Sequence, residues 1–106
     1  FHLWMLKDTE ENEDYLFMSR RYLKKSGRKI KKSDYEEVYD GISVGGKNDH
    51  EIAESIYASL NIEKPADYHA RTFSMGDILV LSDEDRNEKA YFCDTFGFVE
   101  VPEFLS

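Results

Sequence analysis

The sequence predicts a small α+β domain in which two helices pack on a mostly antiparallel sheet that ends in a C-terminal β-hairpin. Three observations support this fold class. The length of 106 residues is that of one domain with a single modest hydrophobic core. Residues 49–60 place apolar side chains at helical spacing. The apolar run 78–81 and the segment 89–95 are separated by a short acidic turn, as in a hairpin.

The N-terminal third should form a strand and a short helix. Residues 1–6 are apolar and aromatic, which favours a strand, and the acidic run 7–14 favours a loop or a short helical turn. Ser19 is a good N-cap for a helix, and Gly27 suits the position just after its last turn. At about 100° per residue, the basic side chains of this helix share an arc of roughly 140° and predict a wholly basic face: Arg20, Arg21, Lys24, Lys25 and Arg28.

The middle of the chain should supply an edge strand and the longer helix. Residues 35–42 mix β-favouring residues with acids in partial alternation, which predicts a strand with one solvated face. Glycines between residues 41 and 46 predict a flexible connection. Asn48 followed by Glu51 is a variant of the capping box, so we expect the helix at 49–60 to begin here.

The C-terminal third should follow a loop without clear periodicity and form the hairpin. Residues 78–81 are apolar without alternation, as in a strand buried on both faces, and 89–95 should return antiparallel after the turn at 83–88. Gly97 should mark a bulge or bend before residues 98–101. The expected core consists of Leu3, Leu23, Ile52, Ile56, Leu60, Ile78, Val80, Phe92 and Val99.

Charge is distributed unevenly along the chain. Residues 1–32 carry a net charge of +4 and residues 33–106 a net charge of −12, which give −8 overall. This acidic balance argues against a conventional nucleic-acid-binding domain, whose surface is broadly basic. It leaves open an acidic mimic of nucleic acid and a protein partner with a basic patch.

Cysteine usage and hydropathy indicate the setting of the protein. Cys93 is the only cysteine, so no disulfide can form within the chain, and no apolar run approaches the ~20 residues that a membrane helix needs. We therefore expect a cytoplasmic protein that does not enter a membrane. Because Phe1 is not an initiator methionine, we expect residues 1–106 to be a single domain excised from a longer chain.

Two ligand-binding motifs are matched in spacing only. Residues 41–47 fit the P-loop spacing, but Asn48 stands where a hydroxyl is needed for Mg²⁺. Residues 83–94 resemble a Ca²⁺ loop but lack its central glycine and its final bidentate glutamate. Cys93 and three dispersed histidines offer no ligand pair at zinc spacing. We expect neither a cofactor nor a metal.

A polar motif surrounds the predicted strand 78–81. Its members are His69, Arg71, Ser74, Asp77, Asp94 and Gly97. A hydrolytic site could use such side chains, but no nucleophile elbow accompanies them. Ser74 or Asp77 can instead cap a turn, and Arg71 can pair with Asp77 or Asp94. We favour turn architecture, and a partner-binding surface or a hydrolytic site remains an alternative.

This part of the chain resembles the YodL-like domain family. The resemblance rests on residues 69–78, His-Ala-Arg-Thr-Phe-Ser-Met-Gly-Asp-Ile, and on residues 91–104, Tyr-Phe-Cys-Asp-Thr-Phe-Gly-Phe-Val-Glu-Val-Pro-Glu-Phe. Looser similarity extends to 14–17, 35–39 and 61–62. Such modules are typical of plasmids and integrative elements of Gram-positive bacteria. The resemblance therefore implies a mobile-element protein whose biochemical role is unknown.

The small size, the lack of a catalytic motif and the two-sign charge predict a non-enzymatic protein-interaction module. One alternative is an acidic DNA-mimic inhibitor of host restriction or defence enzymes. Another is nucleic-acid binding through the basic helix and the residues after it, 19–32, which hold eight Lys and Arg. Charged helix faces are more often merely solvated. If this face does bind a partner, the five basic residues of the predicted arc are the candidates.

Overall fold

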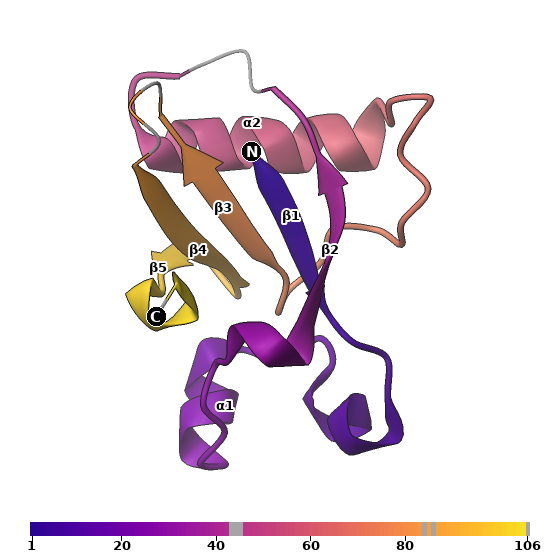
Figure 1. Ribbon diagram of the computed structural model, residues 1–106, viewed down its shortest axis with the longest axis vertical. Helices are drawn as coiled ribbons and strands as arrows, with labels where there is room; N and C mark the ends of the chain where they lie inside the picture. The colour runs from indigo at the N-terminus through magenta and orange to yellow at the C-terminus, as the bar shows by residue number, and fades with distance from the viewer. Residues whose placement is uncertain (43–45, 84, 86, 106) are drawn as a thin grey trace.

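The computed structural model describes residues 1–42, 46–83, 85 and 87–105, which form a five-stranded sheet with helices on both faces (Figure 1). The strand order is β2-β1-β3-β4-β5, and every neighbouring pair is antiparallel. The predicted α+β class is thus confirmed. In chain order the elements are β1 (His2–Leu6), the 3₁₀ helix η1 (Glu10–Tyr15), α1 (Arg20–Lys25), η2 (Lys32–Asp34), β2 (Tyr35–Asp40), α2 (Asp49–Ile62), β3 (Ile78–Ser82), β4 (Glu88–Asp94), β5 (Gly97–Glu100) and η3 (Pro102–Leu105).

Helix α2 begins where the sequence predicts. The Oδ1 atom of Asn48 accepts a hydrogen bond from the Glu51 backbone N–H at 2.9 Å, and Glu51 Oε2 in turn accepts one from the Lys47 N–H at 2.8 Å. These bonds satisfy two donors at the helix start. Lys47, the last residue of the P-loop spacing, and Asn48, which departs from that motif, therefore form a helix cap. Residues 43–45 of that segment, including Gly45 of the expected connection, lie outside the described residues.

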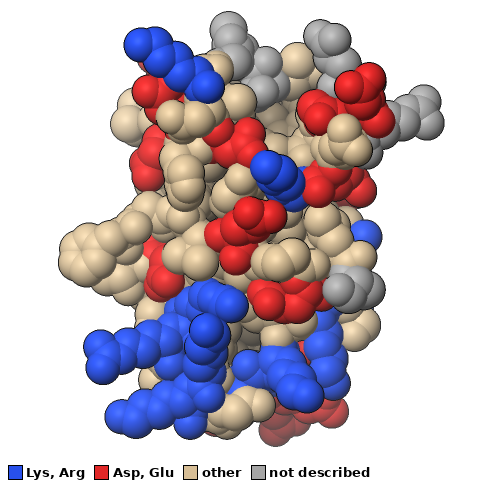
Figure 2. Space-filling view, turned by 90° about the vertical axis from the view of Figure 1, so that its left-hand side faces the viewer, with Lys and Arg blue, Asp and Glu red and all other residues tan. Residues whose placement is uncertain are grey.

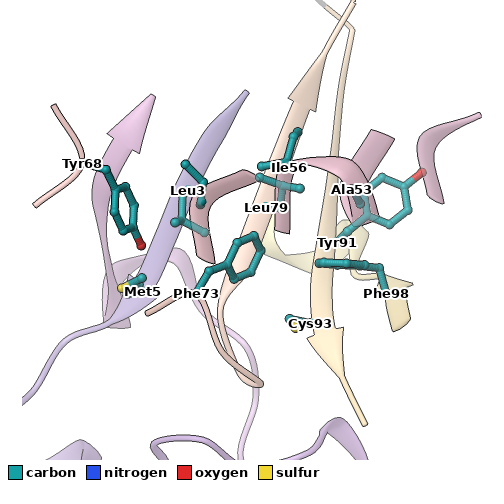
Figure 3. Packing of buried hydrophobic residues seen from close by; sticks show 11 residues of the cluster. Leu3, Met5, Ala53, Ile56, Tyr68, Phe73, Leu79, Tyr91, Cys93 and Phe98 are labelled. Atoms are coloured by element: carbon teal, nitrogen blue, oxygen red, sulfur yellow. The ribbon is translucent and has the colours of Figure 1, made fainter. Parts of the chain in front are cut away.

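The sheet is apolar on both faces, and a hydrophobic core lies on each. On one face, α2 packs its buried residues against side chains from β1, β3 and β4 (Figure 3). On the other face, Leu23 of α1 and Phe104 of η3 cover Ile78, Val80 and Phe92. The expectation of a single core was wrong, because β3 alternates between the two clusters and is buried on both sides.

Two members of the expected core lie nearer the surface than predicted. Val99 is 37% exposed because β5 is an edge strand, so one flank of its side chain faces solvent. Ile52 is only partly buried at the side of α2. The others are buried: Leu3, Leu23, Ile56, Leu60, Ile78, Val80 and Phe92. The apolar pattern thus identified most of the core.

The chain reverses between β4 and β5, where a bulge or bend was expected. Asp94 pairs with Gly97 across a turn formed by Thr95 and Phe96, and Gly97 has a φ of +82°. A positive φ costs least for glycine, which explains why this residue suits the turn. The expectation that Gly97 bends a continuing strand was wrong. The acidic turn between β3 and β4 was predicted correctly, although its residues 84 and 86 are not described.

The described residues include no helix that is long and apolar enough to cross a membrane.

Candidate binding surface beside helix α1

A pocket of about 350 Å³ lies between α1 and the chain that follows it. Two buried apolar side chains, Leu23 and Ile30, form its base. Its other lining residues are Arg20, Lys24, Arg28, Lys29, Lys31 and Glu103. Figure 2 shows basic side chains gathered at the end of the molecule where α1 lies. The pocket therefore combines an apolar base with a rim of five cations and one carboxylate.

The local sequence explains how this pocket forms. Ser19 Oγ accepts a hydrogen bond from the Tyr22 N–H at 3.2 Å and starts the helix. At the other end, the N–H of Arg28 donates to the Leu23 carbonyl at 2.9 Å, and the N–H of Gly27 donates to the Lys24 carbonyl at 3.1 Å. With Gly27 at φ +74°, these two bonds make a Schellman motif. The motif ends α1 so that residues 28–31 line the pocket together with the helix.

Arg28 is one of the predicted binding residues, but its guanidinium is engaged within the protein. Its Nη2 atom donates to Asn12 Oδ1 at 2.5 Å and lies 3.3 Å from Asp34 Oδ2. The guanidinium carbon also lies 4.4 Å from the centre of the Tyr15 ring. Asn12 is itself buried and donates to the Lys7 carbonyl at 3.0 Å. Arg28 therefore holds η1 and η2 beside the pocket.

Arg20 also has internal partners. Its backbone N–H donates to Asp94 Oδ1 at 3.3 Å, and its guanidinium lies 3.7 Å from Glu103 Oε1. These contacts attach the start of α1 to the C-terminal hairpin and to η3. Arg20 still contributes positive charge to the pocket, but Glu103 offsets part of it.

The remaining cations point to solvent. Arg21, Lys24 and Lys25 are exposed, and so are Lys29 and Lys31. Within the part of the chain that the structure describes, no carboxylate lies within 4.0 Å of these five groups. Of the five, only Lys24, Lys29 and Lys31 line the pocket.

The five residues of the predicted arc do not include Lys29 and Lys31, but the wider basic segment 19–32 of the sequence analysis does. Neither prediction indicated the apolar base of the pocket. One signal was present in the sequence: Ile30 is the only apolar residue among the basic residues 28–32. We call the surface formed by Arg21, Lys24, Lys25, Lys29 and Lys31 the basic surface.

Three members of the polar motif, Arg71, Ser74 and Asp77, form a hydrogen-bonded turn before β3. Both terminal nitrogens of Arg71 donate hydrogen bonds to the Asp77 carboxylate, at 2.7 and 3.1 Å. The Ser74 backbone N–H donates to the same carboxylate at 2.7 Å. Asp77 is only 1% exposed. Burial raises the pKa of Asp77 to about 6 although Arg71 and Ser74 lower it. Arg71 thus pairs with Asp77 and not with Asp94.

The other members of the motif do not join this turn. Asp94 Oδ1 accepts hydrogen bonds from the backbone N–H groups of Thr95, at 2.8 Å, and Arg20. Gly97 closes the β4–β5 hairpin, and His69 is exposed. The six residues therefore do not converge on one cleft.

Two further kinds of residue bear on chemistry, the single cysteine and the residue types that bind metals. Burial raises the pKa of the Cys93 thiol to about 12, so this buried sulfur is a poor nucleophile at neutral pH. Among the described residues, no three His, Cys, Asp or Glu side chains are arranged to hold a metal ion.

Comparison with known proteins gives one match. The family model described as the YodL-like domain matches residues 1–104 of the chain. Searches of curated proteins and of solved structures find no match.

Proposed function

The chain belongs to the YodL-like domain family, and on this premise we propose that it is a non-enzymatic interaction module of a mobile-element protein that binds a protein partner through the basic surface. The observation that supports this role is the pocket beside α1. Its rim carries Lys24, Lys29 and Lys31, which have no ion-pair partner within the described residues, and its base is apolar. Protein partners commonly provide both apolar and charged groups to such a surface.

Nucleic-acid binding is a second candidate, because the exposed cations of α1 could contact phosphates. Two observations make it weaker. The net charge of the whole chain is −8, which repels a polyanion at long range. The apolar base of the pocket also has no role in a contact with phosphates.

An acidic mimic of DNA is less well supported by the arrangement of carboxylates. Such a mimic would present rows of free carboxylates, whereas several here are engaged in the fold. Asp77 and Asp94 accept internal hydrogen bonds, and Asp83 accepts two backbone N–H groups within its own turn. The basic surface would also oppose docking on a protein that binds DNA phosphates.

Charge reversal on the basic surface tests the proposed function. The variant carries Arg21→Glu, Lys24→Glu and Lys25→Glu, and its matched control carries Lys47→Glu, Lys64→Glu and Lys89→Glu, which change exposed residues outside α1. Tagged proteins expressed in their native host are used for affinity capture, and each captured protein is then purified and titrated. We expect a partner that binds the wild type and the control but loses at least about tenfold in affinity for the α1 variant.

Two outcomes would contradict the proposal. A partner that binds wild type and α1 variant equally would place the interface elsewhere. A gel shift at low salt in which the wild type binds DNA or RNA, and the α1 variant does not, would favour nucleic-acid binding instead.

A further inference from the structure

We propose that the partner presents an acidic segment with one apolar side chain, and that this side chain enters the pocket between α1 and residues 28–31. This inference rests on the proposed function and specifies the chemistry of the bound segment. It follows from three properties of the pocket, which are its size, its base and its rim.

The size and base of the pocket favour an apolar anchor. A volume of about 350 Å³ lies within the range of pockets that take up small ligands, at its lower end. Leu23 and Ile30 are each less than 10% exposed, so they form a recessed apolar base for a ligand. An apolar side chain placed there removes its own surface and that of the pocket base from contact with water. This burial is the main source of binding free energy.

The rim favours negative charge on both sides of that anchor. Lys24 approaches from α1, whereas Lys29 and Lys31 approach from the chain after it. These two groups come from different elements that line one pocket, so a bound segment would meet cations from both elements. Arg20 and Arg28 also line the pocket but are already paired with Glu103 and Asp34, so they fix its shape. Exposed ion pairs contribute little affinity each, and they mainly orient the segment and speed its association.

The aliphatic part of the rim lysines also suits a peptide ligand. Lysine has a long aliphatic stem, which can cover the flanks of an apolar anchor while the ammonium group stays in water. Phosphates of a nucleic acid would use the ammonium groups and leave the apolar base empty. The rim accepts either anion, and it is the apolar base that favours an acidic peptide over a nucleic acid.

The test uses designed peptides with this chain. One fluorescein-labelled probe consists of glutamates and glycines with a single central leucine, and a second probe has glutamine in place of the leucine. Binding is measured by fluorescence anisotropy at low salt. We expect the leucine probe to bind at least about fivefold more tightly than the glutamine probe, because only leucine gains from burial in the pocket.

Two protein variants separate the pocket from the charge around it. Lys24→Glu with Lys29→Glu changes the rim, and Arg21→Glu with Lys25→Glu makes the same change of net charge on α1 outside the pocket. All four side chains are exposed, so both variants should fold, and circular dichroism checks this. We expect the rim variant to weaken binding of the leucine probe at least about fivefold more than the other variant does, because only the rim variant changes charges that line the pocket.

The outcomes distinguish this inference from the proposed function. Equal binding of both probes would overturn the apolar anchor, and the basic surface could still bind a partner in the charge-reversal test. The inference is also overturned if the two variants weaken binding of the leucine probe equally, or if neither probe binds. Tighter binding of single-stranded DNA than of either peptide would overturn both proposals. Self-association at low salt that the leucine probe does not displace would identify a second copy of the chain as the occupant, against the inference.

Discussion

Replacing Arg71 with alanine should destabilise the protein strongly at neutral pH, because the variant leaves the Asp77 carboxylate buried without its cation. In the native protein this carboxylate is 1% exposed and receives two hydrogen bonds from Arg71 and one from Ser74. Only the Ser74 bond remains in the variant. A buried carboxylate with a single backbone donor is poorly compensated for its lost hydration.

The size of the effect follows from the burial of the two partners. Removing one member of a buried ion pair typically costs about 3–5 kcal/mol. The Arg71 side chain is itself 33% exposed, so the pair lies near the surface and we expect the lower end of this range, about 3 kcal/mol at pH 7.5. For a domain of this size, that loss corresponds to a fall in melting temperature of about 12 °C.

The destabilisation should depend on pH with a definite sign. The pKa of Asp77 in the folded protein is about 6, above its ordinary value of 3.8, so the folded state binds the proton more tightly than the unfolded chain does. Stability linked to this group is therefore present at low pH and is lost as the pH rises through 6. Arg71 lowers this pKa, so the pKa rises further in the variant. The deficit of the variant should be large at pH 7.5 and small at pH 4.5.

Urea unfolding, followed by the fluorescence of the single Trp4, measures this deficit at pH 4.5, 6.0 and 7.5. The control is the same Arg71→Ala change in an Asp77→Asn background, where the deficit should be below about 1 kcal/mol and independent of pH. What remains there is the contact of Arg71 with the Phe17 ring, at 4.8 Å, and its hydrogen bond to the Thr72 carbonyl, at 3.4 Å. A single-variant deficit below about 1 kcal/mol at pH 7.5, or one that is equal at pH 4.5, would refute the reasoning.

Three further predictions concern stability and reactivity. Asn48→Ala should cost about 1 kcal/mol in urea unfolding because the cap bond to the Glu51 N–H is lost, and Asn48→Ser should retain most of it; equal losses would argue against capping. Gly27→Ala should cost about 1 kcal/mol, since a φ of +74° is strained for alanine, and Gly27→Asn should cost about half as much; no difference from wild type would contradict the left-handed turn. At pH 8, Cys93 should react with a disulfide reagent at least about 100-fold more slowly in the folded protein than in urea, because burial raises its pKa to about 12 and hides the sulfur. Comparable rates would show that the thiol is accessible.

Local sequence patterns were sufficient for the type and position of most elements. The cap at Asn48 and the apolar spacing after it predicted α2, which extends two residues beyond the expected end at residue 60. Ser19 and Gly27 predicted the limits of α1, and the unbroken apolar run at β3 predicted a strand buried on both sides. These features depend on hydrogen bonds and periodicities within a few residues, so neighbouring residues contain the information.

Long-range packing determined the rest. The second core exists because residues far apart in the chain, such as Leu23 and Phe104, meet on the same face of the sheet. Val99 is exposed because β5 is the last strand of the sheet, which the apolar pattern of β5 does not reveal.

The same distinction applies to the functional surfaces. The sequence predicted a basic face on α1, because helical geometry alone places its cations together. It did not show that Arg28 is engaged with Asn12 and Asp34, nor that the carboxylate paired with Arg71 is that of Asp77 and not Asp94. The pocket depends on how the chain after Gly27 packs beside α1. Pairing of charges and the shape of a pocket depend on distances in three dimensions, and these are set by how the whole chain packs.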